Sequence, residues 1–131
     1  MTFELTALAL VGLLHIAQFS VASYMANVDV GMGYTTSPRD RLPSREMRQI
    51  TARMLRAYDN AAVMLPLFAA AALIIHTTGQ SSAYTATLAF TYLAARALYI
   101  PAYAFGWRPW RSYIWIAALT CCALMFLAAL I

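Results

Sequence analysis

The residues of this chain that are best suited to chemistry are arginines and tyrosines set within otherwise apolar stretches. Arg96 comes four residues after Tyr92, and Tyr99 and Tyr103 follow at spacings of three and four. This spacing places the four side chains on one face of an α-helix. A guanidinium and three phenols are costly to expose to hydrocarbon, so they should face another helix or a polar cavity. The stripe predicts either polar contacts that hold helices together or the wall of a binding site for a polar ligand.

A second set of polar side chains precedes it in the sequence. Arg53, Arg56 and Asn60 are spaced by three and four, again on one helical face. Asp59 lies beside this face, and we consider an ion pair with Arg56 or Arg96. Asn60 offers both hydrogen-bond donors and acceptors, for a ligand or for a neighbouring helix, where such a bond contributes about 1 kcal/mol or less.

A third candidate is the pair Arg111 and Ser112, which follows Trp110. An arginine and a hydroxyl at the start of a helix form a positive, donor-rich position that stabilises a thiolate or another developing anion. The alternative is a basic anchor that contacts lipid phosphate at the membrane surface.

No grouping has the spacing of a metal site. His15 and Gln18 lie three residues apart without a further ligand nearby, which favours a helix–helix contact. Cys121 and Cys122 are neighbours in an apolar run and are expected to be small packing residues rather than a disulfide. We therefore predict no metal ligands.

The composition indicates an integral membrane protein. Of 131 residues, 63% are hydrophobic and only 11% charged, and the mean hydropathy is +0.65. A soluble domain is about 25% charged, so the natural solvent of this chain is a bilayer with lipids as partners. The nine basic residues are all arginines. Their place in the connections is better explained by the positive-inside bias than by nucleic-acid binding, which we do not expect.

Apolar stretches of about 20 residues, enough to cross a bilayer, predict an all-α, integral membrane four-helix bundle. The expected spans are residues 3–26, 57–77, 83–105 and 110–131, within a single domain 1–131. Ser44 is the expected N-cap of a helix that starts at Arg45 and runs unbroken into the second span.

Helix ends and orientation follow from the connecting segments. Thr2 and Ser81 or Ser82 are expected N-caps, Gly79 and Gly106 are expected helix ends, and Pro109 is expected to open the last helix. The connections 27–44 and 106–111 are basic, whereas residues 77–82 carry no charge. The basic connections should therefore be cytoplasmic and both termini should lie on the opposite side.

Together these residues resemble a known family. The sequence is similar to the MAPEG proteins (membrane-associated proteins in eicosanoid and glutathione metabolism), most of all to their small bacterial branch. The motifs that carry the resemblance are Arg56-Ala57-Tyr58-Asp59-Asn60 with Pro66-Leu67-Phe68, Arg96-Ala97-Leu98-Tyr99 with Tyr103, Arg108-Pro109-Trp110-Arg111-Ser112, and the turn Ser37-Pro38-Arg39-Asp40. The resemblance implies a homotrimer in the bacterial inner membrane that binds glutathione between subunits, near the cytoplasmic side.

By the same resemblance, the protein would be a membrane glutathione transferase that activates a glutathione thiolate toward a lipophilic electrophile or a lipid hydroperoxide. Arg111, with Ser112, would stabilise the thiolate. Glutathione itself would be held by Arg56, Asn60, Arg96, Tyr99 and Tyr103, with Arg53 as a more distant contact.

One position departs from the family pattern. The family has a glutamate three residues after the asparagine, which is thought to meet the amino group of the ligand, and this chain has Val63 there. Losing one charge-assisted hydrogen bond costs roughly 1.5–3 kcal/mol, or about ten- to a hundredfold in affinity. The alternative is therefore a catalytically silent MAPEG-like membrane protein that binds a lipid or a protein partner. A small transporter is a weaker possibility, because Asp59 lies near the membrane boundary.

Overall fold

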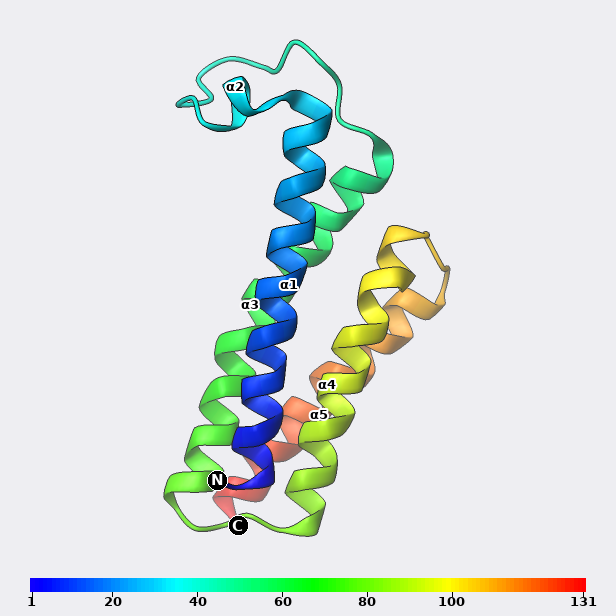
Figure 1. Cartoon of the computed structure of the whole chain (residues 1–131). Coiled ribbons are helices and arrows are strands. Elements are labelled where there is room, and N and C mark those ends of the chain that lie inside the picture. Colours follow the sequence, from blue (N-terminus) through cyan, green and yellow to red (C-terminus); the bar gives the residue numbers. More distant parts are fainter.

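The computed structural model describes all residues 1–131, and every regular element in it is a helix. The elements are α1 (Phe3–Val30), α2 (Met32–Thr35), α3 (Gln49–Thr77), α4 (Ala83–Ala104) and α5 (Trp110–Leu130). The four long helices alternate in direction, so both termini lie at one end of the bundle (Figure 1). The α1–α3 and α4–α5 connections, which carry most of the arginines, lie at the other end, and we call it the basic end.

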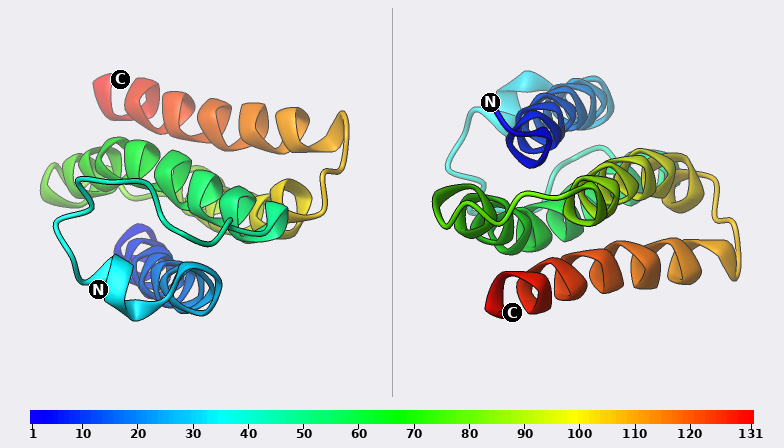
Figure 2. Two further views of the ribbon diagram at one scale, coloured as in Figure 1. Left: turned by 90° about the horizontal axis from the view of Figure 1, so that it is seen from above. Right: turned by 90° about the horizontal axis from the view of Figure 1, so that it is seen from below.

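The long helices form three layers. Seen along the bundle, α3 and α4 occupy the middle layer, α1 covers one side of it and α5 covers the other (Figure 2). Helices α1 and α5 do not contact each other, and most of the buried residues lie on α3 and α4. The helices that carry the predicted polar stripes, α3 and α4, therefore lie at the centre of the bundle.

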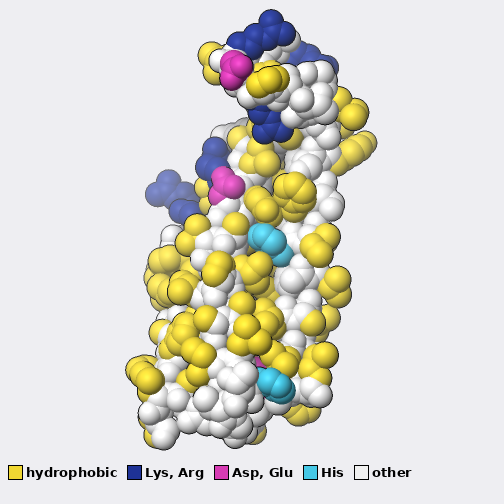
Figure 3. Space-filling model, turned by 90° about the vertical axis from the view of Figure 1, so that its left-hand side faces the viewer, with side chains coloured by type: hydrophobic (Ala, Val, Ile, Leu, Met, Phe, Trp, Pro, Cys, Tyr) yellow, Lys and Arg dark blue, Asp and Glu magenta, His cyan; other side chains and the backbone are white.

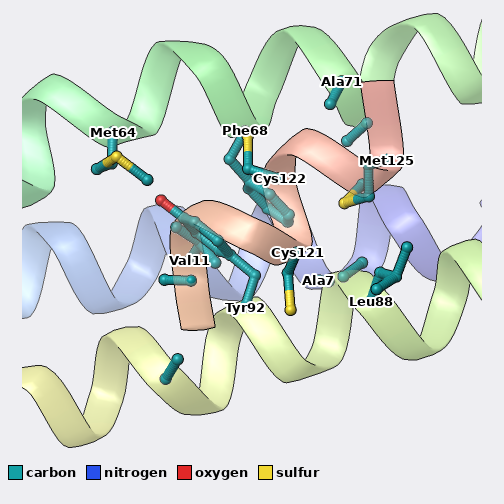
Figure 4. Packing of buried hydrophobic residues seen from close by; sticks show 14 of the residues in the cluster. Ala7, Val11, Met64, Phe68, Ala71, Leu88, Tyr92, Cys121, Cys122 and Met125 are labelled. Atoms are coloured by element: carbon teal, nitrogen blue, oxygen red, sulfur yellow. The ribbon is translucent and has the colours of Figure 1, made fainter. Parts of the chain in front are cut away.

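The main hydrophobic core lies between the four helices, in the half of the bundle near the termini. It contains 15 buried residues. At its centre, the rings of Phe68 and Tyr92 stack with their centroids 4.1 Å apart and their planes 4° apart, and Cys122 points toward them (Figure 4). Cys121 and Cys122 are free thiols and are buried in this packing, as expected.

The surface confirms an integral membrane protein. Only 27 of 131 residues are buried, and many large apolar side chains face outward. In Figure 3 hydrophobic side chains cover most of the length of the bundle, whereas the basic ones gather toward one end. Helices α1, α3 and α5 are long and apolar enough to cross a membrane, and an 18-residue stretch of each has a mean hydropathy of 1.8, 1.7 and 2.2, respectively. Helix α4, the expected third span, is not among these candidates, so its membrane crossing remains a prediction.

Most predicted helix ends are confirmed. The Thr2 hydroxyl caps α1 and Ser82 forms a capping box with Thr85 at the start of α4. Helix α3 ends just before Gly79, whose φ is +68°. Two boundaries were predicted wrongly: α1 continues to Val30, four residues further than expected, and α3 begins at Gln49 rather than at Arg45.

The late start of α3 has a structural cause. Asp29, near the end of α1, accepts hydrogen bonds from the backbone N–H of Arg48 at 3.0 Å and from its Nε at 2.8 Å. These bonds hold Arg48 in an extended conformation with ψ 152°. The helix therefore begins after the residue that α1 fixes in place, and Ser44 does not act as its N-cap.

Candidate functional site

The predicted stripe on α4 faces the interior of the bundle. Tyr92, Arg96 and Tyr99 are 1%, 4% and 2% exposed. The Nη1 of Arg96 donates a hydrogen bond to Oδ1 of Asn60 on α3 at 2.9 Å. Its Cζ lies 4.4 Å from the ring centroid of Tyr99, within the range of a cation–π contact. The two predicted stripes thus meet at Asn60, Arg96 and Tyr99, which we call the inner group.

No carboxylate neutralises the inner group. Asp59 is exposed, and the one ion pair of the chain joins Arg48 to Asp29. The expected pairing of Asp59 with Arg56 or Arg96 is therefore wrong. The physical reason is rotation: each helical residue turns by about 100°, so Asn60 faces α4 while Asp59 points outward. Arg96 keeps its charge in the bundle with only an amide oxygen and an aromatic ring as partners.

Tyr103, one helical turn beyond Tyr99, is contacted by two further arginines. Its hydroxyl accepts a hydrogen bond from Nε of Arg56 at 3.1 Å. The Cζ of Arg111 lies 5.0 Å from the ring centroid. The ring of Tyr99 packs against that of Tyr103 with their centroids 5.7 Å apart. Tyr103 therefore links α3, α4 and α5, and it connects these arginines to the inner group.

A cavity of about 480 Å³ opens beside Tyr103, and we call it the basic crevice. Three of its eight lining residues are arginines, and none is acidic. Its lining residues are Arg53, Tyr103, Gly106, Trp107, Arg108, Pro109, Arg111 and Ser112. Arginines from separate segments thus converge on a shared hollow at the basic end.

Arg53 holds one wall of the basic crevice. Its Nη1 donates a hydrogen bond to the carbonyl oxygen of Ala104, at the C-terminal end of α4, at 3.2 Å. A Cβ on Gly106 would lie only 3.3 Å from this Nη1. Gly106 also has a φ of +67°, which side-chain-bearing residues rarely adopt. A glycine at this turn therefore allows both the end of α4 and the close approach of Arg53.

The predicted site residues divide into two connected groups. Arg53, Tyr103, Arg111 and Ser112 line the basic crevice, whereas Asn60, Arg96 and Tyr99 do not. Arg56 joins the groups through its hydrogen bond to Tyr103.

Arg108 and Val63 lie near these two groups. Arg108 also lines the basic crevice and was not among the predicted site residues. Its place in a basic connection and its position at the start of the motif that also holds Arg111 and Ser112 were the signals that could have identified it. Val63, at the family's glutamate position, is 70% exposed on the outer face of α3.

A polar contact between α1 and α3 lies close to the inner group. The ring of His15 stacks on Tyr58, with their centroids 4.7 Å apart and their planes 24° apart. Gln18 is buried, and its Nε2 has no hydrogen-bond partner. It lines a very small space together with His15, Tyr92 and Arg96. The helix–helix role expected of His15 agrees with this packing.

The electrostatics of the site favour an anion. Arg53, Arg56, Arg96 and Arg111 reach the crevice or the inner group, and no acidic side chain forms an ion pair with any of them. In a membrane-embedded bundle the low dielectric strengthens the attraction of such a cluster for negative charge. Donor groups placed around a hollow can bind carboxylates and stabilise an anion that forms there.

Comparison with known proteins identifies the family. The sequence model of the MAPEG family matches residues 3–131, nearly the whole chain. Searches of curated proteins and of solved structures gave no match.

Proposed function

Since this chain belongs to the MAPEG family, we propose that it is a membrane glutathione transferase-like protein. In this proposal glutathione binds at the basic crevice and the inner group as a co-substrate. Its thiolate then reacts with a lipophilic electrophile or a lipid hydroperoxide that reaches the site from the bilayer. Family membership supports the membrane setting and a role of this kind, and the arginines of the basic crevice are suited to this chemistry.

The observation that carries the proposal is the group of arginines without acidic partners. Glutathione has two carboxylates, and guanidinium groups bind carboxylates with strong, directional hydrogen bonds. Arg96 is 4% exposed and has no ion pair. A buried cation of this kind is costly unless a ligand or a partner supplies negative charge. A carboxylate of glutathione, held by Arg96 and Asn60, would supply it.

We assign the reacting thiol to the Arg111 side of the site. Arg111 and Ser112 line the basic crevice together, and a guanidinium close to a thiol lowers the thiol pKa and favours the thiolate. Tyr103 would orient Arg111, because its ring lies beneath that guanidinium. The thiolate sulfur would then form a bond to the electrophilic carbon, whose leaving group departs with the bonding electrons.

With a lipid hydroperoxide the same thiolate would attack the outer oxygen. The O–O bond breaks, the lipid alkoxide takes a proton, and glutathione sulfenic acid is released. A second glutathione then condenses with it to give the disulfide and water. The site residues have the same roles in both reactions, so the choice between them depends on the substrate.

The proposed assembly is a homotrimer with the site between neighbouring subunits. Arg56 and Val63 on α3, and Arg111 and Ser112 on α5, are exposed in the single chain. A neighbouring subunit would cover these side chains and exclude water from the thiol. We further propose that α4 is the remaining membrane span, that the basic end is cytoplasmic, and that the membrane is the bacterial inner membrane.

Glutathione binding and thiolate absorbance test the proposal. We expect the detergent-purified protein to bind glutathione and to show the ultraviolet absorbance of a thiolate. Arg111→Ala should abolish the absorbance while binding remains measurable, because Arg96 and Asn60 still hold the ligand. Arg39→Ala, which removes an exposed arginine outside the site, is the matched control. The absence of binding at millimolar glutathione would exclude the proposal.

Val63 supports a second candidate, a MAPEG-like protein without catalysis that binds a lipid or a protein partner. The valine cannot form a charged contact with the amino group of glutathione, so the affinity for glutathione is lowered. Val63→Glu separates the two candidates. Measurable glutathione binding by Val63→Glu, where the wild type binds none, would favour the silent protein. Measurable wild-type affinity with turnover would favour the transferase.

A further inference from the structure

A second basic pocket lies in the connection after α1, apart from the basic crevice. It has a volume of about 390 Å³ and is lined by residues between Val30 and Arg45. Its charged members are Arg41 and Arg45, and Tyr34 and Ser44 add hydroxyl groups. We call it the loop pocket. It shares no residue with the basic crevice, so a ligand here is separate from the proposed glutathione site.

No ion pair within the chain holds the two arginines of the loop pocket. Neither Arg41 nor Arg45 forms an ion pair, because the one ion pair of the chain joins Arg48 to Asp29. No acidic residue lines the pocket. Two guanidinium groups, which only donate hydrogen bonds, lie beside two hydroxyl groups that can also donate, and such a set is suited to the oxygens of a phosphate.

The shape of the chain at Gly31 fixes one side of the loop pocket. A Cβ built on Gly31 would lie 2.6 Å from Nη2 of Arg45, and the φ of Gly31 is +88°. Only a residue without a side chain leaves room for the Arg45 guanidinium against the end of α1. The Arg45 guanidinium thus lies close to the backbone at the end of α1, on one side of the loop pocket.

The position of the pocket along the bundle corresponds to lipid headgroups. Helix α1 has 28 residues, or about 42 Å at about 1.5 Å per residue. The hydrocarbon core is about 30 Å thick, and the bilayer with its headgroups about 40–45 Å. The end of α1, where the pocket begins, thus reaches headgroup depth. Leu42 lines the pocket and is 89% exposed, and nearby Met32 is 65% exposed, as expected for side chains that enter the acyl boundary.

From these observations we propose that the loop pocket binds the headgroup phosphate of an anionic phospholipid. Arg41 and Arg45 donate hydrogen bonds to the phosphate oxygens, with the hydroxyls of Tyr34 and Ser44 as further donors. Leu42 contacts the acyl chains of the same lipid. The bound lipid would fix the 31–45 segment on the membrane surface, on the same side as the basic crevice.

Lipid binding in detergent tests the proposal. Native mass spectrometry would compare phosphatidylglycerol with phosphatidylcholine on the wild type and on Arg41→Gln and Arg45→Gln, made singly and together. We expect preferential binding of phosphatidylglycerol, weakened about fivefold by each substitution. Both arginines are exposed, so the helical content of the variants should match the wild type. Arg39→Gln is the control, because the Arg39 guanidinium is bound to the Thr35 carbonyl and does not line the loop pocket.

Further measurements distinguish a lipid headgroup phosphate from free inorganic phosphate. Inorganic phosphate should not displace phosphatidylglycerol at low millimolar concentration, because it lacks the contact with Leu42. Displacement at that concentration would replace the lipid assignment with a free-phosphate site. Equal phosphatidylglycerol binding by the double variant and by Arg39→Gln would overturn the assignment of the loop pocket as the lipid site. Glutathione affinity should be unchanged in the double variant, and its loss would show that the two sites are not independent.

Discussion

The Arg111 guanidinium lies over the ring of Tyr103, with its Cζ 5.0 Å from the ring centroid. The Tyr103 hydroxyl at the same time accepts a hydrogen bond from Arg56. Tyr103 thus contacts α5 through its ring and α3 through its hydroxyl. The two roles can be separated by substitution, because phenylalanine keeps the ring and leucine keeps neither.

We expect Tyr103→Phe to weaken glutathione binding by about three- to tenfold, because Arg56 loses a hydrogen bond worth about 1 kcal/mol. The fraction of bound thiolate at a given pH should remain close to that of the wild type. Tyr103→Leu should lower that fraction as well, because Arg111 loses the ring that positions it. Thiolate absorbance measured against pH for the bound ligand is the readout. Identical absorbance curves for the two variants would contradict the positioning role of the ring.

The hydrogen bond between Arg96 and Asn60 gives a second prediction. Asn60→Asp places a carboxylate 2.9 Å from the buried guanidinium and provides the counter-charge that we assign to the ligand. The variant should be at least as stable as the wild type to heat in detergent, yet it should bind glutathione at least about tenfold more weakly. Asn60→Ala should lower stability by about 1–3 kcal/mol, since Arg96 loses its hydrogen-bond acceptor. Wild-type affinity in Asn60→Asp would show that the Arg96 charge does not bind the ligand.

The sequence was sufficient to predict what depends on local periodicity. Spacings of three and four placed Tyr92, Arg96 and Tyr99 on one face, and the structure buries all of them. The four long helices were likewise marked by apolar length and by capping residues. These features follow from the 3.6-residue repeat and from local hydrogen bonds, so a single sequence is enough to identify them.

Features that depend on contacts between distant segments were not predictable. Asn60 and Asp59 are neighbours, and only the rotation of α3 against α4 decides which one meets Arg96. The start of α3 was misplaced because Asp29, 19 residues earlier, binds Arg48. The place of Arg108 in the crevice wall depends on how the α4–α5 turn folds back over Arg53. A one-dimensional pattern carries no information on such relationships.

The bond between Asp29 and Arg48 gives a third prediction. The Asp29 side chain is 3% exposed and that of Arg48 is 59% exposed, so the carboxylate is held firmly while its partner is partly in water. Asp29→Ala should therefore destabilise the protein and loosen the first turn of α3. Amide hydrogen exchange at residues 52–55, whose N–H groups are the first to be bonded within the helix, should become at least about tenfold faster. Asp40→Ala, which removes an exposed acid without an ion pair, should change nothing, and unchanged exchange in Asp29→Ala would contradict this explanation of the helix start.

A buried carboxylate at the opposite end of the bundle gives the last prediction. Glu4 is fully buried and accepts hydrogen bonds from the hydroxyls of Ser81 and Thr85, which tie the start of α1 to the start of α4. Glu4→Ala removes both acceptors and should destabilise the protein by about 1–3 kcal/mol. Glu4→Gln keeps one acceptor oxygen and should cost less. The midpoint of thermal unfolding in detergent measures both.

Because Glu4 lies at the far end from the arginines, neither of its substitutions should change glutathione affinity. Glu46→Ala, an exposed acid in the α1–α3 connection, is the matched control and should leave the unfolding midpoint within the usual range for surface changes. A Glu4→Ala protein as stable as the control would show that the two hydroxyl contacts do not hold α1 against α4. A loss of glutathione affinity in Glu4→Ala would show instead that the two ends of the bundle are coupled through the packed core between them.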